Sequence, residues 1–200
     1  MIKHTIGKEV PELFRHFFIF IEKQNMRQNI NIVASDFHQR YINLVKHEDI
    51  CDSIKTSALA FEQLLQQIQP VKRDFAYAEG KWTLKQMLQH LVDAERVFAL
   101  RAVWFARKDP SPLPGFDENL WGANAVVTGR SWESLVEEFT LLRKATILLF
   151  ESFADNELNT TGVANNHPIT VAAVGYISAG HLQHHMGIIR ERYGVVAVGS

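Results

Sequence analysis

The sequence predicts an all-α protein, a four-helix bundle, and three observations support this fold class. Apolar residues recur at three- and four-residue steps in four stretches between about residue 49 and residue 193. The stretches have similar lengths, roughly 20–25 residues or 30–37 Å each, and similar lengths favour a bundle. The composition agrees, because 46% hydrophobic and 22% charged residues in a chain of 200 suit a single domain with a sizeable core.

The first two helices are expected at Asp49–Ile68 and at Leu84–Arg107. Pro70 ends the first, because proline lacks the N–H and clashes within a helix. Thr83 and Gln86 predict the start of the second, since they match a capping box in which each side chain satisfies a free backbone N–H. The apolar stripes are Ile50, Ile54, Phe61, Leu64, Leu65 and Ile68 in the first helix, and Leu84, Met87, Leu91, Ala94, Phe98 and Phe105 in the second.

The last two helices are expected at Ser131–Phe153 and at Thr170–Tyr193. Ser131 is a suitable N-cap for the third, and Gly194 a suitable C-cap for the fourth. The connection from Pro110 to Arg130 is longer than a tight helix–helix turn. We expect it to cover one end of the bundle, where long loops are often functional.

Residues 1–40 read as an N-terminal extension, and residues 41–200 as the bundle domain. Within the extension, Glu9–Lys23 fits a helix with Phe14, Phe17, Phe18 and Ile21 on one side. Two interpretations stay open: an appended helix that covers a hydrophobic patch, or a start site placed too early, with Met26 nearer the true beginning.

Charge and cysteine content exclude several classes. With a net charge of -1, the chain has no basic excess for a phosphate backbone, so we expect no nucleic-acid partner. The apolar stretch Leu13–Ile21 is interrupted by charge and too short to span a membrane, and it lacks a signal-peptide cleavage site. We therefore expect a cytoplasmic protein. The single cysteine, Cys51, fits a reducing compartment and is expected as a half-buried helix residue.

Two of the nine histidines, His181 and His185, lie four residues apart in the last predicted helix. That spacing places both imidazoles on one face, within reach of one ion. They also fall on the inward seam of this helix. His90 lies beside the inner stripe of the second helix, and His184 falls off the seam. The remaining histidines are expected on the surface (His4, His16, His38 and His47) or in a turn (His167).

These three positions allow two interpretations. A core histidine is more often hydrogen-bonded than bound to a metal, and an i,i+4 pair alone is a weak signal. Three unpartnered imidazoles near one seam would be costly to bury, however, and therefore need a common explanation. A three-histidine site would leave one coordination position open for water or substrate.

Three motifs resemble the DinB-like superfamily of metalloenzymes. The stretch Gly80–Arg96, GKWTLKQMLQHLVDAER, resembles its first signature, and Gly180–His185 followed by Arg190–Tyr193 resembles its closing signature. Pro112–Asp117 is similar to its middle loop. The resemblance covers roughly residues 41–193, and the two signatures at opposite ends of the domain are specific when taken together.

The resemblance implies a four-helix bundle, commonly a homodimer, that holds one divalent metal with His90, His181 and His185. Gln89 departs from the family, where glycine is frequent, which affects helix packing and not ligation. Imidazole suits zinc, nickel, copper and iron, of which we expect zinc or nickel. Characterised relatives include thiol-dependent S-transferases and a thiol-dependent isomerase, while others are regarded as metal-dependent hydrolases.

From the resemblance we expect a thiol-dependent S-transferase acting on a small molecule, with the ion activating a low-molecular-weight thiol cosubstrate. The first alternative is a metal-dependent hydrolase, in which the ion lowers the pKa of a bound water to around 7. The second is a non-catalytic metal-binding or stress-response protein. The third is an interaction module, which would expose a sizeable apolar patch.

Further polar and aromatic residues are candidates around such an ion. Glu95, Asp93 and Tyr176 are expected to support the metal ligands or to carry protons. Arg101 is expected as a bidentate ligand of a substrate carboxylate, and Trp121 at the mouth of the site. Trp82 is expected first as a packing anchor and, as a second interpretation, at the mouth of the site. The structural alternatives are exposed ion pairs for Glu95 and Arg101 and a packing role for Tyr176.

Overall fold

The computed structural model describes residues 30–45 and 49–195, and the predicted four-helix bundle is confirmed. Its long helices are α3 (Ile50–Gln67), α4 (Leu84–Ala106), α6 (Trp132–Ser152) and α8 (Val171–Tyr193). Every bound lies within one residue of the expected one. The helix expected at Glu9–Lys23, together with Met26, His4, His16 and His47, lies outside the described residues. None of the helices in the described ranges is both long and apolar enough to cross a membrane.

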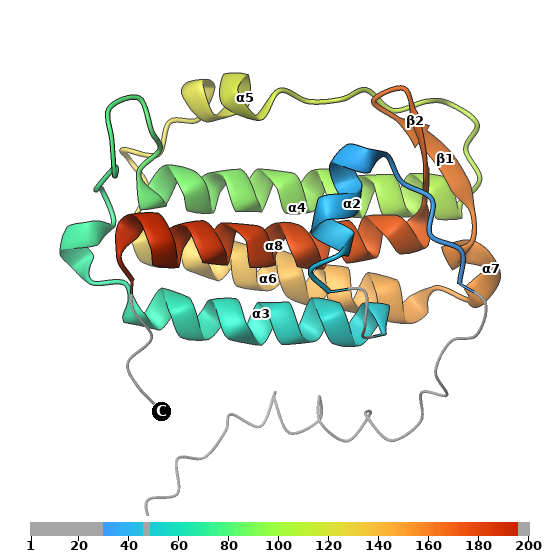
Figure 1. Ribbon diagram of the computed structural model, residues 1–200, viewed down its shortest axis with the longest axis horizontal. Helices are drawn as coiled ribbons and strands as arrows, with labels where there is room; N and C mark the ends of the chain where they lie inside the picture. Colours follow the sequence, from blue (N-terminus) through green and yellow to red (C-terminus); the bar gives the residue numbers. More distant parts are fainter. Residues whose placement is uncertain (1–29, 46–48, 196–200) are drawn as a thin grey trace, which may run out of the picture.

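The four long helices lie side by side, with α4 and α6 running in the same direction (Figure 1). The chain leaves α4 at one end and returns along the whole bundle before α6 begins, and α5 (Glu118–Asn124) forms on this return segment. The long connection was expected to cover one end of the bundle. It instead runs along the side formed by α4, because α6 starts at the same end as α4 does.

The helix ends form where local signals specify them. At the start of α4, the Thr83 hydroxyl accepts from the backbone N–H of Gln86 at 3.2 Å, and the Gln86 side chain accepts from the N–H of Thr83 at 2.8 Å. Ser131 caps α6 by accepting from the N–H of Ser134. Gly194 ends α8 with a φ of 62°, a left-handed conformation that glycine adopts without strain.

Besides α5 and a helix that precedes α3, four short elements were not predicted. They are η2 (Pro70–Lys72), α7 (Asp155–Leu158) and the antiparallel strands β1 (Thr161–Ala164) and β2 (His167–Thr170). Ala164 pairs with His167, so Asn165 and Asn166 alone make the turn. Their φ values of 49° and 62° are those of a two-residue hairpin turn that favours asparagine. His167, expected in a turn, therefore begins a strand.

A further helix, α2 (Asp36–Ile42), crosses α8 (Figure 1). The segment before it is tied to the bundle, because the N–H of Val33 donates to the Thr170 hydroxyl at 3.2 Å and the N–H of Thr170 donates to the Val33 carbonyl at 3.1 Å. The expected boundary between residues 40 and 41 falls inside α2. The described part of the chain therefore joins the bundle from residue 30 onward.

Gly180 allows α2 to lie directly on α8, since a Cβ at this position would overlap with the backbone carbonyl of Tyr41. We expect Gly180→Ala to displace α2 and to lower the free energy of unfolding by about 1–3 kcal/mol, the usual cost of overpacking. Gly187→Ala is the matched control on the same helix, because nothing lies within 4 Å of a Cβ there. That variant should gain about 0.5–1 kcal/mol in helix propensity. Urea unfolding of both variants tests this, and equal effects would contradict the close approach.

The interior consists of two apolar clusters separated by a polar layer. The predicted stripes of α3 and α4 are buried throughout, and Cys51, expected to be half-buried, is fully buried among them. Along α4 the boundary between the two clusters falls between Val92 and Ala94, and along α8 it falls between Ala179 and Leu182. At this level each long helix contributes one buried polar residue: Ser57, Glu95, Arg143 and Ser178. We refer to these four residues as the polar layer.

Candidate metal centre

Next to the polar layer, three imidazoles converge from α4 and α8. The Nε2 atom of His181 lies 3.2 Å from Nε2 of His90 and 3.1 Å from Nε2 of His185. One ring nitrogen from each histidine lies within 4.8 Å of the others. The four-residue spacing stacks His181 and His185 on one face of α8, and the packing of α4 against α8 supplies His90.

The donor set fits a divalent ion. Zinc–imidazole bonds of about 2.0–2.1 Å in a tetrahedral site separate neighbouring nitrogens by roughly 3.3–3.4 Å, close to the separations between these Nε2 atoms. Without an ion, His90 and His185 would both have to donate to the single Nε2 lone pair of His181, and Nδ1 of His185 would still lack a partner in the part of the chain that the structure describes. A divalent ion held by His90, His181 and His185 would accept one lone pair from each ring, and three protein ligands would leave it a position for water or substrate.

Burial keeps all three histidines neutral. Desolvation lowers the pKa of His90 from 6.5 to about 4, against a small opposing effect of Glu118. Desolvation also lowers the pKa of His181 and His185 well below 6.5, and the neighbouring histidines add to the shift. Neutral imidazole is the form that binds a metal, so the site needs no deprotonation at physiological pH.

Packing orients the rings. His90 packs against Trp82 in a tilted arrangement with ring centroids 4.9 Å apart, and His181 makes T-shaped contacts with Tyr41 at 5.4 Å and Phe98 at 5.5 Å. A ligating histidine usually donates its second ring N–H to an acceptor. Nδ1 of His185 is buried and has no such partner among the described residues, which is a departure from that pattern.

The three histidines line a cavity of about 400 Å³. It lies between α4, α8, α2 and the return segment that carries α5. Its polar lining includes His38, Arg40, Arg101 and Glu118. Aromatic rings contributed by α2, α4, the segment before α4 and the return segment form much of the remaining wall: Phe37, Tyr41, Trp82, Phe98 and Phe116.

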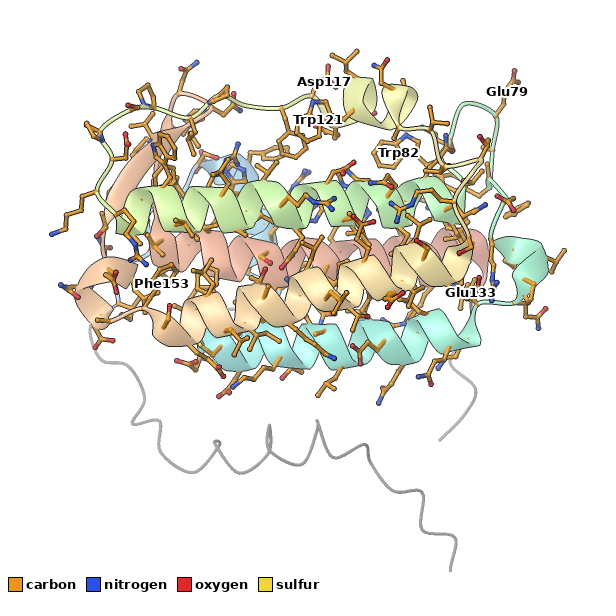
Figure 2. All side chains as sticks on the ribbon, turned by 180° about the vertical axis from the view of Figure 1, so that it is seen from behind. Glu79, Trp82, Asp117, Trp121, Glu133 and Phe153 are labelled. Carbon is orange, nitrogen blue, oxygen red and sulfur yellow. The ribbon has the colours of Figure 1, made fainter. Side chains whose placement is uncertain are left out.

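Arg101 and Trp82, two candidates from the sequence, line this cavity. Arg101 is only 5% exposed, so the alternative of a surface ion pair is wrong. Trp82 lies between α5 and α4 (Figure 2), where a Cβ on Gly122 would come within 2.8 Å of its ring. Trp82 therefore both lines the cavity and anchors α5.

Trp121, expected at the mouth, does not line the cavity. It is 43% exposed, stacks on Phe116 at 4.8 Å between ring centroids, and borders a separate shallow hollow. Asp117 fixes this orientation by capping α5, where its carboxylate accepts from the N–H groups of Asn119 and Leu120. The helix then presents Gly122, and not Trp121, to the Trp82 ring.

Glu95 and Tyr176 also lie outside the cavity lining. Glu95 is buried in the polar layer, where Nη1 of Arg143 donates to both of its carboxylate oxygens at 3.0 and 2.8 Å. The Ser178 hydroxyl donates to Glu95 at 3.0 Å, and Arg143 also contacts this hydroxyl. The ion pair expected as the alternative role of Glu95 is thus present but buried. Tyr176 is buried in one of the two apolar clusters.

Sequence reasoning missed the contribution of α2 to the cavity. His38, expected on the surface, is partly buried there and hydrogen-bonds to the Ser35 hydroxyl at 2.9 Å. Burial, together with Arg101, His167 and Arg40, lowers the pKa of His38 to about 4. No motif marks α2, because its seven residues are too few for a periodic pattern. The small residue Gly180, next to His181, was the available signal that a backbone approaches α8.

The fold and the site define a four-helix-bundle protein with three converging histidines, a metal-binding arrangement. The chain belongs to the DinB superfamily, whose family model matches residues 54–189. Over 125 residues, 59% of this chain and 69% of the relative, it is 29% identical to a Geobacillus kaustophilus protein named "Putative metal-dependent hydrolase".

The fold is also similar to a solved structure, YfiT from Bacillus subtilis, described as "a probable metal-dependent hydrolase with an unusual four-helix bundle topology". The TM-score is 0.58 at 15% identity, and the match covers 88% of this chain and 97% of that one. At this identity the likeness concerns the fold alone. In this chain the parallel course of α4 and α6 departs from the up-down-up-down order of simple four-helix bundles.

Proposed function

We propose that the chain is a metal-dependent enzyme in which His90, His181 and His185 hold one divalent ion, zinc or nickel. The observation that carries this proposal is the convergence of three neutral imidazoles, at Nε2 separations of 3.1 and 3.2 Å, on a cavity large enough for a small molecule. Three protein ligands beside a cavity are typical of a catalytic site, whereas structural sites usually close all four positions.

The ion would supply a positive charge that lowers the pKa of a nucleophile placed next to it. The remaining work falls to residues of this chain. Trp82 packs against the His90 ring, and Tyr41 and Phe98 pack against the His181 ring, which limits how these imidazoles can turn. Arg101 offers a fixed cation to an anionic group, and the exposed Glu118 adds a carboxylate to the cavity lining.

Water is the first candidate nucleophile, which makes the enzyme a hydrolase. The Geobacillus relative supports this choice, since it is named as a metal-dependent hydrolase and aligns over 59% of the chain.

A low-molecular-weight thiol is the second candidate, which makes the enzyme a thiol-dependent S-transferase. A thiol loses its proton near pH 8.5 and needs less help from a base than water does. Among the described residues that line the cavity, the exposed Glu118 is the only carboxylate. The thiol would come from a cosubstrate, because Cys51 is buried in the core.

Metal content tests the proposal directly. Untagged protein, purified without added metal, should contain about one divalent ion per chain by elemental analysis, as a three-histidine site predicts. We expect His181→Ala/His185→Ala to lose nearly all of it. His184→Ala is the matched control, because His184 also lines the cavity on α8 but does not belong to the converging group. Absence of metal in wild-type protein, even after titration with zinc and nickel, would overturn the proposal.

The metal-loaded enzyme can then distinguish the two nucleophiles. Activated esters and amides are assayed without thiol, and electrophilic acceptors are assayed with a low-molecular-weight thiol. Turnover of the first set alone identifies a hydrolase, and thiol-dependent turnover of the second identifies an S-transferase. In either case the activity should fall by at least about 100-fold in His181→Ala/His185→Ala.

A further inference from the structure

Arg101 is a buried cation without a counter-ion in the described part of the chain. Only 5% of it is exposed, and a guanidinium has five N–H donors. Among the described residues it makes one hydrogen bond, from Nη2 to the carbonyl of Pro114 at 3.3 Å, while its Nε is buried without a partner. Desolvation accordingly lowers the pKa of Arg101.

The second buried arginine shows how this protein satisfies such a group when the role is structural. Arg143 is 2% exposed, and although its Nε also lacks a partner within the described ranges, its two Nη atoms donate to the Glu95 carboxylate, to the hydroxyls of Ser57 and Ser178, and to the Ser178 carbonyl. A buried charge is costly unless an opposite charge and hydrogen bonds compensate it. Arg143 has this compensation and lies in the polar layer, whereas Arg101 lacks it and lines the cavity.

The surroundings of Arg101 favour an anion. Arg40 is a second cation in the lining, held over the Phe37 ring at 4.0 Å and bonded to the Tyr41 hydroxyl. Burial and Arg101 itself keep the nearby His38 neutral, as its lowered pKa of about 4 indicates. The nearby rings, including Phe98 and Phe116, offer apolar contact to the rest of a ligand.

We propose that the substrate is an organic anion, whose carboxylate binds Arg101 and whose apolar or aromatic part lies against the ring wall. This inference rests on the proposed function, since it takes the cavity as the active site. A guanidinium binds a planar carboxylate through two parallel N–H···O bonds, and the bound carboxylate would supply the counter-ion that Arg101 lacks.

Binding of benzoate and of its neutral isostere benzamide tests the proposal. The full chain is first stripped of metal with a chelator, so that the carboxylate cannot bind an ion directly. NMR titration at low ionic strength should show benzoate binding about 10-fold or more tightly than benzamide in the wild type. Arg101→Met keeps the aliphatic stem of the side chain and should abolish this preference. Arg107→Met is the matched control, because Arg107 is exposed, follows α4 and is paired with Glu157.

Unfolding in urea gives a second readout for the same variant. If the substrate supplies the counter-ion, Arg101→Met should leave the ligand-free protein at least as stable as the wild type, since it removes an uncompensated buried charge. Equal binding of benzoate and benzamide by the wild type, or a preference that survives in Arg101→Met, would overturn the proposal. Neither result bears on metal content, so a failed anion site and a failed metal site remain distinguishable.

Discussion

Glu95→Ala is expected to lower the free energy of unfolding by about 3–5 kcal/mol, among the largest effects of any single substitution in this bundle. The reason is that the positive charge of Arg143 would stay buried without its carboxylate partner. Arg143 is 2% exposed, and Glu95 is the carboxylate that compensates it, at 2.8 Å. Without Glu95 the guanidinium stays buried with only hydroxyl and carbonyl acceptors. Urea unfolding of metal-free protein at pH 7 measures the loss without interference from the metal site.

A double-mutant cycle separates this explanation from simple loss of packing. Arg143→Met alone should also destabilise, because it leaves the Glu95 carboxylate buried without its partner. Combining Glu95→Ala with Arg143→Met removes both charges, so the double variant should be more stable than the sum of the single effects predicts, by at least about 1 kcal/mol. Additive effects would show that the two groups are not coupled.

A second substitution of Glu95 tests the catalytic role that the sequence suggested for it. Glu95→Gln keeps the size of the side chain and one acceptor oxygen for Ser178 but removes the charge. A purely structural role predicts a loss of stability with unchanged activity per folded molecule, whereas a proton carrier would lose activity in the fraction that is folded. Because Glu95 does not line the cavity, we expect the first outcome.

Metal-free protein should lose stability steeply as the pH falls from 7 to 5. Folding holds the pKa of His90 at about 4, while in the unfolded chain it is near 6.5. Between these values the unfolded state binds more protons than the folded state, so acid favours unfolding. At pH 5 His90 alone should lower the free energy of unfolding by about 2 kcal/mol. His181 and His185 act in the same direction, because burial lowers the pKa of both.

Chelator-treated protein unfolded in urea at pH 7, 6 and 5 provides the measurement. His90→Gln serves as the comparison, since glutamine is similarly polar but does not titrate, and this variant should depend less steeply on pH. Stability that stays constant from pH 7 to pH 5 would mean that the imidazoles are better hydrated than their burial implies.

The long helices were predictable because their signals are local. The capping box of Thr83 and Gln86 and the glycine cap at Gly194 act within one turn of a helix end, and the bounds agree to within one residue. The hairpin was missed because strands of four residues carry too little alternation to detect, although Asn165 and Asn166 marked its turn. Helix α2 depends on a tertiary contact that periodicity does not encode.

The converging histidines were predictable in part, and the cavity hardly at all. The i,i+4 spacing of His181 and His185 follows from helix geometry, but their meeting with His90 depends on how α4 lies against α8. The resemblance to a family supplied that step. Arg101 and Trp121 looked equally plausible in the sequence. In the structure Arg101 lines the cavity and Trp121 does not. Trp121 points elsewhere because the cap of α5 and the contact of Gly122 with Trp82 fix the orientation of that helix.

The meeting of His90 with His181 also constrains how the molecule assembles. The two residues are 91 positions apart, so the cluster forms only once α8 has docked against α4. Contacts this distant carry a large loop-closure entropy and tend to form late in folding. An ion bound there would stabilise the finished bundle more than the folding transition state. Its main kinetic effect would then be to slow unfolding, with little change in the folding rate. The metal would therefore hold the folded bundle together after folding and would not guide the folding itself.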